Sequence, residues 1–246
     1  MNNAIYAAVL GSRIETMRMD VVANNVANVD TPGFKADYAV FKNNLDYVSG
    51  NGKGLKLIGR EGAGINTYFS AEPSLVTGPI HATGRKTDVA IDGDGFFVVQ
   101  SAKGEAYTRA GNFKLDINGN LITSSGDLVM GDGGPIAIDP AKEISFGADG
   151  TVYSGTQSVD KLRIVDFERS ALKKAGTNLF AKDARAMEKP DPKFQIVPEA
   201  LEGSNVNAVR EMSAMLTSGR QFEAYQKAIK MMDDINSKST NTLGRL

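Results

Sequence analysis

The sequence predicts an α+β protein with long N- and C-terminal helices and a central antiparallel all-β domain. Apolar residues recur every three or four positions at both ends of the chain, which is the spacing of one helix face. Between the ends, short β-branched and aromatic runs alternate with Asp-Gly and Asn-Gly pairs, which is typical of antiparallel hairpins. The chain therefore reads as helix, linker, β domain, linker, helix.

The N-terminal helix is predicted from Asn3 to Asn28, and it should end by about Val29. The next residues, Asp30-Thr31-Pro32-Gly33, favour an end there because a residue before proline avoids the helical region and glycine turns freely. Residues 34–48 form either a short helix or an extended arm, so 1–48 is one N-terminal region. The apolar row of this helix is Ile5, Leu10, Ile14, Met17 and Val21, and Asn24 and Asn28 continue it.

A glycine-rich segment, 49–64, follows as a predicted flexible linker, because glycine raises the entropic cost of ordering a chain. Residues 65–185 are the predicted β domain. Within it, Asn118-Gly119 predicts a hairpin with a type I′ turn, and Leu162–Phe167 is interpreted as the last strand. Residues 186–203 contain three prolines and are predicted to be a return linker.

The C-terminal helix is predicted within 204–246, with Ser204 or Asn205 as its cap. At ~1.5 Å per residue it would be on the order of 50 Å long, which is more than most globular helices. Its apolar row is Val209, Met212, Met215, Phe222, Ile229 and Met232. Two interpretations stay open: the terminal helices pair within one chain, or their apolar rows interlock between copies.

Composition limits the function classes. The chain has 246 residues, 41% hydrophobic, with a formal net charge of -1, so it lacks the basic surface that nucleic-acid binding needs. It has no cysteine, which excludes disulfides and thiol catalysis. No apolar run approaches ~18 residues and no cleavable signal is recognisable, so we expect no membrane insertion.

Catalytic and metal-binding patterns are weak. Asp116–Asn120 begins like a calcium loop, but Leu121 stands where that loop needs glycine. His81 is the single histidine, it is interpreted as a loop residue, and no serine lies in a nucleophile-elbow sequence. We therefore expect no cofactor, no metal and no enzyme activity.

Three segments resemble the bacterial flagellar rod and hook proteins. ANNVANVDTPGFK (23–35) resembles their N-terminal signature, and LEGSNVNAVREM (201–212) resembles their C-terminal one. Between them, DVAIDGDGFFVV (88–99) and YTRAGNFKLDINGNL (107–121) are similar to the shared β core. The opening MNNAIYAA looks more like a proximal-rod protein of the basal body than a distal-rod protein.

This resemblance implies a structural axial subunit that assembles in the periplasmic rod and transmits torque from motor to hook. Its terminal helices would form an assembly coiled coil with copies of the chain and with other rod proteins, after passage through the flagellar type III export apparatus. A distal-rod protein, or a non-flagellar filament or adhesin subunit with a β head, is the alternative. The expected subunit interface comprises the two apolar rows with Asn24, Asn25, Asn28, Pro32 and Phe34. The asparagines either fix helix register or mark a helix end, and Phe34 docks either in a neighbour or in its own chain.

Overall fold

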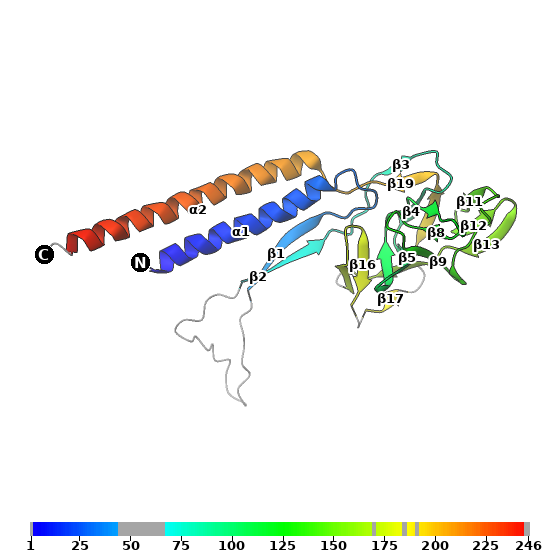
Figure 1. The fold of residues 1–246 in the computed structure, drawn as a ribbon, viewed down its shortest axis with the longest axis horizontal. Coiled ribbons are helices and arrows are strands. Elements are labelled where there is room, and N and C mark those ends of the chain that lie inside the picture. Colours follow the sequence, from blue (N-terminus) through cyan, green and yellow to red (C-terminus); the bar gives the residue numbers. More distant parts are fainter. Residues whose placement is uncertain (1, 44–66, 169–170, 184–185, 190–191, 244–246) are drawn as a thin grey trace, which may run out of the picture. The chain divides into compact units, whose positions relative to one another are not determined.

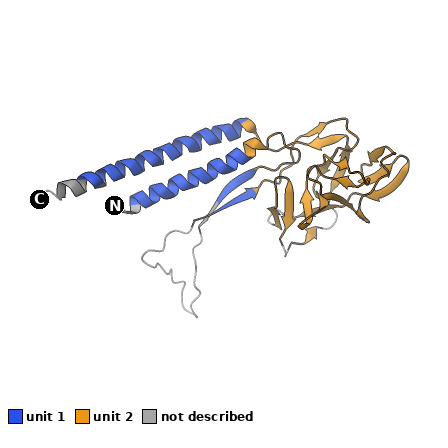
Figure 2. Cartoon of the chain, in the orientation of Figure 1, with its two compact units in different colours: residues 1–24, 37–72, 209–246 blue, residues 25–36, 73–208 orange. Residues whose placement is uncertain are grey.

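The computed structural model describes residues 2–43, 67–168, 171–183, 186–189 and 192–243. The chain divides into two compact units, each built from segments that are distant in sequence (Figure 2). Unit 1 consists of Met1–Asn24, Asp37–Glu72 and Val209–Leu246. Unit 2 consists of Asn25–Ala36 and Pro73–Ala208. The α+β class is confirmed, because a helix lies at each end of the chain and antiparallel strands lie between them.

Unit 1 contains most of the two helices, α1 (Asn2–Ala27) and α2 (Ala208–Leu243), together with a two-stranded sheet. The strands of that sheet are β1 (Asp37–Asn43) and β2 (Thr67–Pro73), both labelled in Figure 1. Residues 37–43 are therefore extended, which decides between the two conformations open for the arm. The glycine-rich segment 49–64 lies outside the described residues.

Unit 2 is an antiparallel β structure. Within the described residues its largest sheet has ten strands, in the order β15-β16-β6-β5-β9-β8-β7, with β10 on β9, β14 on β5 and β17 on β14. Smaller sheets pair β11-β12-β13, β18-β4 and β19-β3. The strands are β3 (Ile80–Ala82), β4 (Val89–Gly93), β5 (Phe96–Ser101), β6 (Gly104–Thr108), β7 (Lys114–Leu115), β8 (Leu121–Ile122), β9 (Leu128–Gly131), β10 (Gly134–Pro135), β11 (Ile144–Phe146), β12 (Thr151–Ser154), β13 (Gln157–Lys161), β14 (Ile164–Phe167), β15 (Leu172–Lys174), β16 (Leu179–Lys182), β17 (Glu188–Lys189), β18 (Phe194–Pro198) and β19 (Ala200–Glu202).

Strand β5 lies between two apolar cores. Successive side chains of a strand point to opposite faces, so Phe97 and Val99 enter one core while Phe96 and Val98 enter the other. The first core is closed by an edge-on contact between Phe97 and Phe113, with ring centroids 5.2 Å apart. The uninterrupted apolar run that breaks strict alternation in the sequence is thus explained by a strand that is covered on both faces.

The return-linker prediction for 186–203 is wrong in its secondary structure. These residues contain β17, β18 and β19, and β18 pairs with β4 so that Ile196 lies opposite Ile91. Ile196 is buried in the first core. The prolines do not prevent this pairing, because Pro198 is the last residue of β18 and removes only its own backbone donor there. Because five more strands, β15 to β19, follow it in the described residues, Leu162–Phe167 is not the last strand.

Two local predictions also change. The Asn118-Gly119 hairpin between β7 and β8 is confirmed, but among the described residues Glu199 is the one non-glycine residue with positive φ, so the turn is not type I′. Asp116 instead accepts hydrogen bonds from the Asn118 and Asn120 backbone amides, which shapes the loop. His81 lies on strand β3 and not in a loop, and its backbone pairs with that of Leu201 on β19.

Candidate functional site

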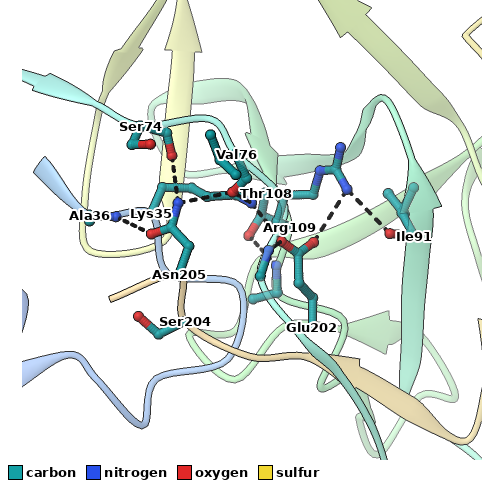
Figure 3. A network of polar contacts seen from close by, with 12 residues as sticks. Lys35, Ala36, Ser74, Val76, Ile91, Thr108, Arg109, Glu202, Ser204 and Asn205 are labelled. Carbon is teal, nitrogen blue, oxygen red and sulfur yellow. Dashed lines mark hydrogen bonds and ion pairs between the residues drawn. The ribbon is translucent and has the colours of Figure 1, made fainter. Parts of the chain in front are cut away.

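Three charged side chains from distant parts of the chain meet inside unit 2. Lys35 follows α1, Arg109 follows β6, and Glu202 ends β19 (Figure 3). The Lys35 Nζ atom lies 2.5 Å from Glu202 Oε1, and Arg109 Nη1 lies 3.3 Å from Glu202 Oε2. The exposed fractions of the three side chains are 0%, 4% and 0%. We call Lys35, Arg109 and Glu202 the ion cluster.

Backbone groups add hydrogen bonds to the ion cluster, although the Arg109 Nε atom is buried without a hydrogen-bond partner among the described residues. Lys35 Nζ donates to the Val76 carbonyl at 2.8 Å, and Arg109 Nη2 donates to the Gly93 carbonyl at 2.8 Å. The Gly78 backbone amide donates to Glu202 Oε1 at 2.8 Å. A buried charge is tolerated when it is paired and hydrogen-bonded, and each of these three charges meets that condition.

Asn205 ties the same segments together without a charge. Its Oδ1 accepts from the Ala36 amide at 2.7 Å, and its Nδ2 donates to the carbonyls of Ser74 at 2.8 Å and Val76 at 2.9 Å. The prediction that Ser204 or Asn205 caps α2 is wrong, because the Asn205 side chain bonds these other segments and the Ser204 hydroxyl accepts from the Val206 amide. The helix begins at Ala208, so the capping position falls to Asn207.

Phe34 is covered by its own chain and not by a neighbour. It is 1% exposed and packs with Ala36 and Val206 in a small apolar cluster. Lys174 Nζ lies 4.1 Å from the centre of its ring, a cation–π contact, and also donates to the Lys35 carbonyl at 2.7 Å. The carbonyl of Pro32 accepts a hydrogen bond from Asn178 Nδ2 at 3.0 Å.

Gly33 lets the N-terminal segment approach the β structure closely. Its φ is +68°, and a Cβ at this position would lie 2.4 Å from the Ala110 backbone nitrogen. Its amide donates to the Glu202 carbonyl at 2.7 Å. Glycine is therefore required here twice, by its backbone conformation and by the absence of space.

Burial and the Glu202 carboxylate shift the pKa values of Lys35 and Arg109 in opposite directions. Burial lowers the pKa of Lys35 below its ordinary value, and the Glu202 carboxylate opposes that shift. Burial likewise lowers the pKa of Arg109, again with Glu202 acting against it. Repulsion from Arg109 further lowers the pKa of Lys35. Glu202 is thus the group that makes both buried charges tolerable.

The residues of the two predicted apolar rows differ in how exposed their side chains are. Val209 and Met212 are 79% and 52% exposed. The other members are half-buried, namely Ile5, Leu10, Ile14, Met17 and Val21 on α1 and Met215, Phe222, Ile229 and Met232 on α2. Contact of these rows with neighbouring copies stays a prediction.

Within unit 1, α1 and α2 touch through residues that lie outside the predicted apolar rows. A Cβ on Gly11 would lie 2.5 Å from the Tyr225 ring. The Gln221 amide nitrogen, oriented to donate, lies 3.0 Å and 3.1 Å from the two carboxylate oxygens of Glu15. Ala8, Ser12 and Glu15 are all buried on this face of α1, at the spacing i, i+4, i+7. Small residues at helical spacing were the available signal.

Several large apolar side chains of the helices are exposed, among them the two row members Val209 and Met212. On α1 they are Tyr6 and Val9, and on α2 they are Val209, Met212, Leu216, Tyr225, Met231 and Ile235. Leu216 lies about 200° around α2 from Ser218, which is buried, so this apolar surface faces away from the buried side of the helix. We call Val209, Met212 and Leu216 the outer stripe of α2.

The asparagines near the end of α1 also differ from one another. Asn24 is exposed, whereas Asn25 is 1% exposed. Asn28 follows the helix, and its Oδ1 accepts a hydrogen bond from the Thr31 hydroxyl at 3.2 Å, while its carbonyl accepts from the Thr31 amide. Asn28 therefore shapes the turn that leads to Gly33.

The described part of the chain shows neither a membrane-spanning helix nor a group of side chains arranged to bind a metal ion. Neither of its helices combines the length and the apolar character needed to cross a membrane. The same residues contain no group of three or more His, Cys, Asp or Glu side chains arranged to hold a metal ion.

Three family models match the chain, and each match contains one member of the ion cluster. The model described as flagella basal body rod protein matches residues 13–35, which end at Lys35. The flagellar hook protein FlgE/F/G D1 domain matches 90–154, which include Arg109. The flagellar basal body rod FlgEFG protein C-terminal model matches 197–243, which include Glu202. The ion cluster thus joins the three regions by which this class of axial protein is recognised.

Curated relatives match over almost the full length. The flagellar basal-body rod protein FlgF of Salmonella typhimurium is 34% identical, over 99% of this chain and 99% of its own length. FlgG of Bacillus subtilis is 33% identical over 98% and 99%, and FlgF of Caulobacter vibrioides is 34% identical over 100% and 98%. The chain belongs to the flagellar basal-body rod protein family.

Proposed function

We propose that this chain is a structural axial subunit of the flagellar basal-body rod that polymerises through its terminal helices and transmits torque from motor to hook. The observation that carries the proposal is the set of large apolar side chains left exposed on α1 and α2, including the outer stripe of α2. Exposed apolar surface of this kind is typical of protein interfaces. Full-length similarity to basal-body rod proteins supports the rod as its location.

The finer assignments rest on the resemblance of the sequence. The chain is a proximal-rod protein, passes through the flagellar type III export apparatus, works in the periplasm beside other rod proteins, and has no enzyme activity. Its helices form a coiled coil in the assembly. Relatives named FlgF and FlgG match at nearly equal identity, so a distal-rod protein remains the second candidate.

The test places a charge in the apolar surface of the helices. Leu216→Asp in the outer stripe, and Leu10→Asp and Met215→Asp in the predicted rows, should each abolish rod assembly and swimming, because each buries a carboxylate in an apolar contact. Swimming in soft agar and electron microscopy of isolated basal bodies measure the effect. As a control, the purified full-length variants are melted and followed by circular dichroism. The melting temperature of the β structure of unit 2 should be unchanged.

Thr217→Asp is the matched control, since it adds the same charge at the next position, about 100° around the helix from Leu216. Thr217 is exposed, and its hydroxyl donates to the Ser213 carbonyl of its own helix. Swimming should persist in this variant. Normal swimming of the Leu216→Asp, Leu10→Asp and Met215→Asp strains at normal protein levels would remove the helices from the assembly mechanism.

A further inference from the structure

The ion cluster contains two cations and one carboxylate, and the carboxylate comes last in the chain. Glu202 lies 167 residues beyond Lys35 and 93 residues beyond Arg109. Asp94 and Asp166 also attract Arg109, but Glu202 contributes the largest attraction and a direct hydrogen bond. Without Glu202, closing the site would bring Lys35 and Arg109 together with no buried anion to balance them.

The segment that carries Lys35 depends on Glu202 in a second way. The Gly33 amide donates to the Glu202 carbonyl, and the Gly78 amide donates to the Glu202 side chain. Glu202 is therefore bonded to the N-terminal segment, to the chain before β3 and to the residue after β6. In a chain that still lacks the C-terminal segment, Glu202 is absent, so Lys35, Arg109 and the amides of Gly33 and Gly78 have none of these bonds to it.

We propose that Glu202 acts as a charge gate for unit 2, so that residues 25–36 dock on the β structure only when the C-terminal segment is in place. Chains are synthesised from the N-terminus, so Lys35 and Arg109 are both present long before Glu202. During that time the mutual repulsion of two cations and the cost of burying them keep residues 25–36 undocked. The gate goes beyond the proposed rod function, because it concerns the closing of unit 2 in a single chain.

The charge, rather than the shape, of Glu202 is the tested quantity. Glu202→Gln keeps the side chain's size and an oxygen that accepts from Gly78, but it leaves Lys35 and Arg109 without the buried carboxylate that pairs with both. Lys35→Met removes one cation and leaves Glu202 paired with Arg109. The double variant Lys35→Met/Glu202→Gln carries one buried cation in place of two. A charge gate therefore predicts that the double variant closes better than Glu202→Gln alone.

Hydrogen–deuterium exchange with mass spectrometry on the full chain measures docking directly. In Glu202→Gln, exchange of the peptide 25–36 should accelerate on the order of 100-fold or more, while β5 peptides stay slow. In Lys35→Met/Glu202→Gln, a large part of the protection of 25–36 should return. Glu199→Gln is the matched control, since Glu199 pairs with the exposed Lys86, and it should leave exchange of 25–36 unchanged.

Two results overturn the charge gate. One is wild-type exchange of residues 25–36 in Glu202→Gln. The other is exchange in Lys35→Met/Glu202→Gln that equals or exceeds that of Glu202→Gln, because a purely structural loss of contacts would add. If Glu202→Gln unfolds all of unit 2, recovery of slow β5 exchange in the double variant supports the gate, and its continued absence refutes it.

Discussion

Unit 1 and unit 2 differ in how they place large apolar side chains: unit 2 holds both large clusters of buried ones, although Ile117 and Met187 on its surface are exposed. In unit 2, Phe97 and Tyr107 have no exposed surface, whereas in unit 1 Leu216 and Met231 are 64% and 60% exposed. Unit 2 also buries its ion cluster with partners for each charge, while α1 and α2 touch through small and polar residues such as Gly11 and Glu15. Unit 2 encloses two packed apolar cores, and unit 1 leaves large apolar side chains exposed on its helices.

The largest expected contrast between the units is the effect of truncating one large apolar side chain in each of them. Phe97→Ala should lower the free energy of unfolding of unit 2 by about 3–5 kcal/mol, because it opens a cavity in a packed core. Leu216→Ala should change the stability of the single chain by less than about 0.5 kcal/mol, since its side chain is mostly exposed already. Urea denaturation followed by near-ultraviolet circular dichroism compares the two variants. Equal losses would mean that unit 1 is packed like unit 2.

A second prediction separates lack of space from backbone strain within unit 2. Gly33→Ala should destabilise unit 2 by about 2–4 kcal/mol, because it adds a clash with backbone atoms to the strain of a positive φ. Gly84→Ala is the matched control, since Gly84 has a φ of +71° but nothing within 4 Å of its added Cβ. It should cost about 1 kcal/mol through strain alone. Thermal melts of both variants test this, and equal shifts would contradict the close approach at Gly33.

The smallest expected effect is that of the same substitution in unit 1. Gly11→Ala also meets a neighbour at 2.5 Å, but the obstacle is the ring of Tyr225, a side chain that is 36% exposed and can turn away. Alanine in a helix interior is favoured over glycine by about 1 kcal/mol. The variant should therefore be neutral or slightly more stable in thermal melts followed at 222 nm. A loss comparable to that of Gly33→Ala would show that the α1–α2 contact is rigid.

Long helices and short strands were predictable because their signals are local. The end of α1 was placed to within two residues by the Pro32-Gly33 pair, and the β7–β8 hairpin by Asn118-Gly119. Conversely, residues 194–202 were assigned to a linker, because the prolines around them are a local signal for irregular structure. Strand β18 forms because its pairing with β4 and the burial of Ile196 outweigh that signal, and both contributions are long-range.

The sequence alone determined the α+β class, the positions of the terminal helices and the three motifs, because helical periodicity and turn residues act over a few positions. Only the tertiary structure decided that Lys35, Arg109 and Glu202 form one buried cluster and that Phe34 packs in its own chain. It also decided which face of α1 meets α2. The physical reason is that a charged side chain needs a specific partner only when the fold buries it, and burial depends on residues that are distant in the sequence. Periodicity, in turn, identifies the apolar face of a helix but not the residues that cover that face.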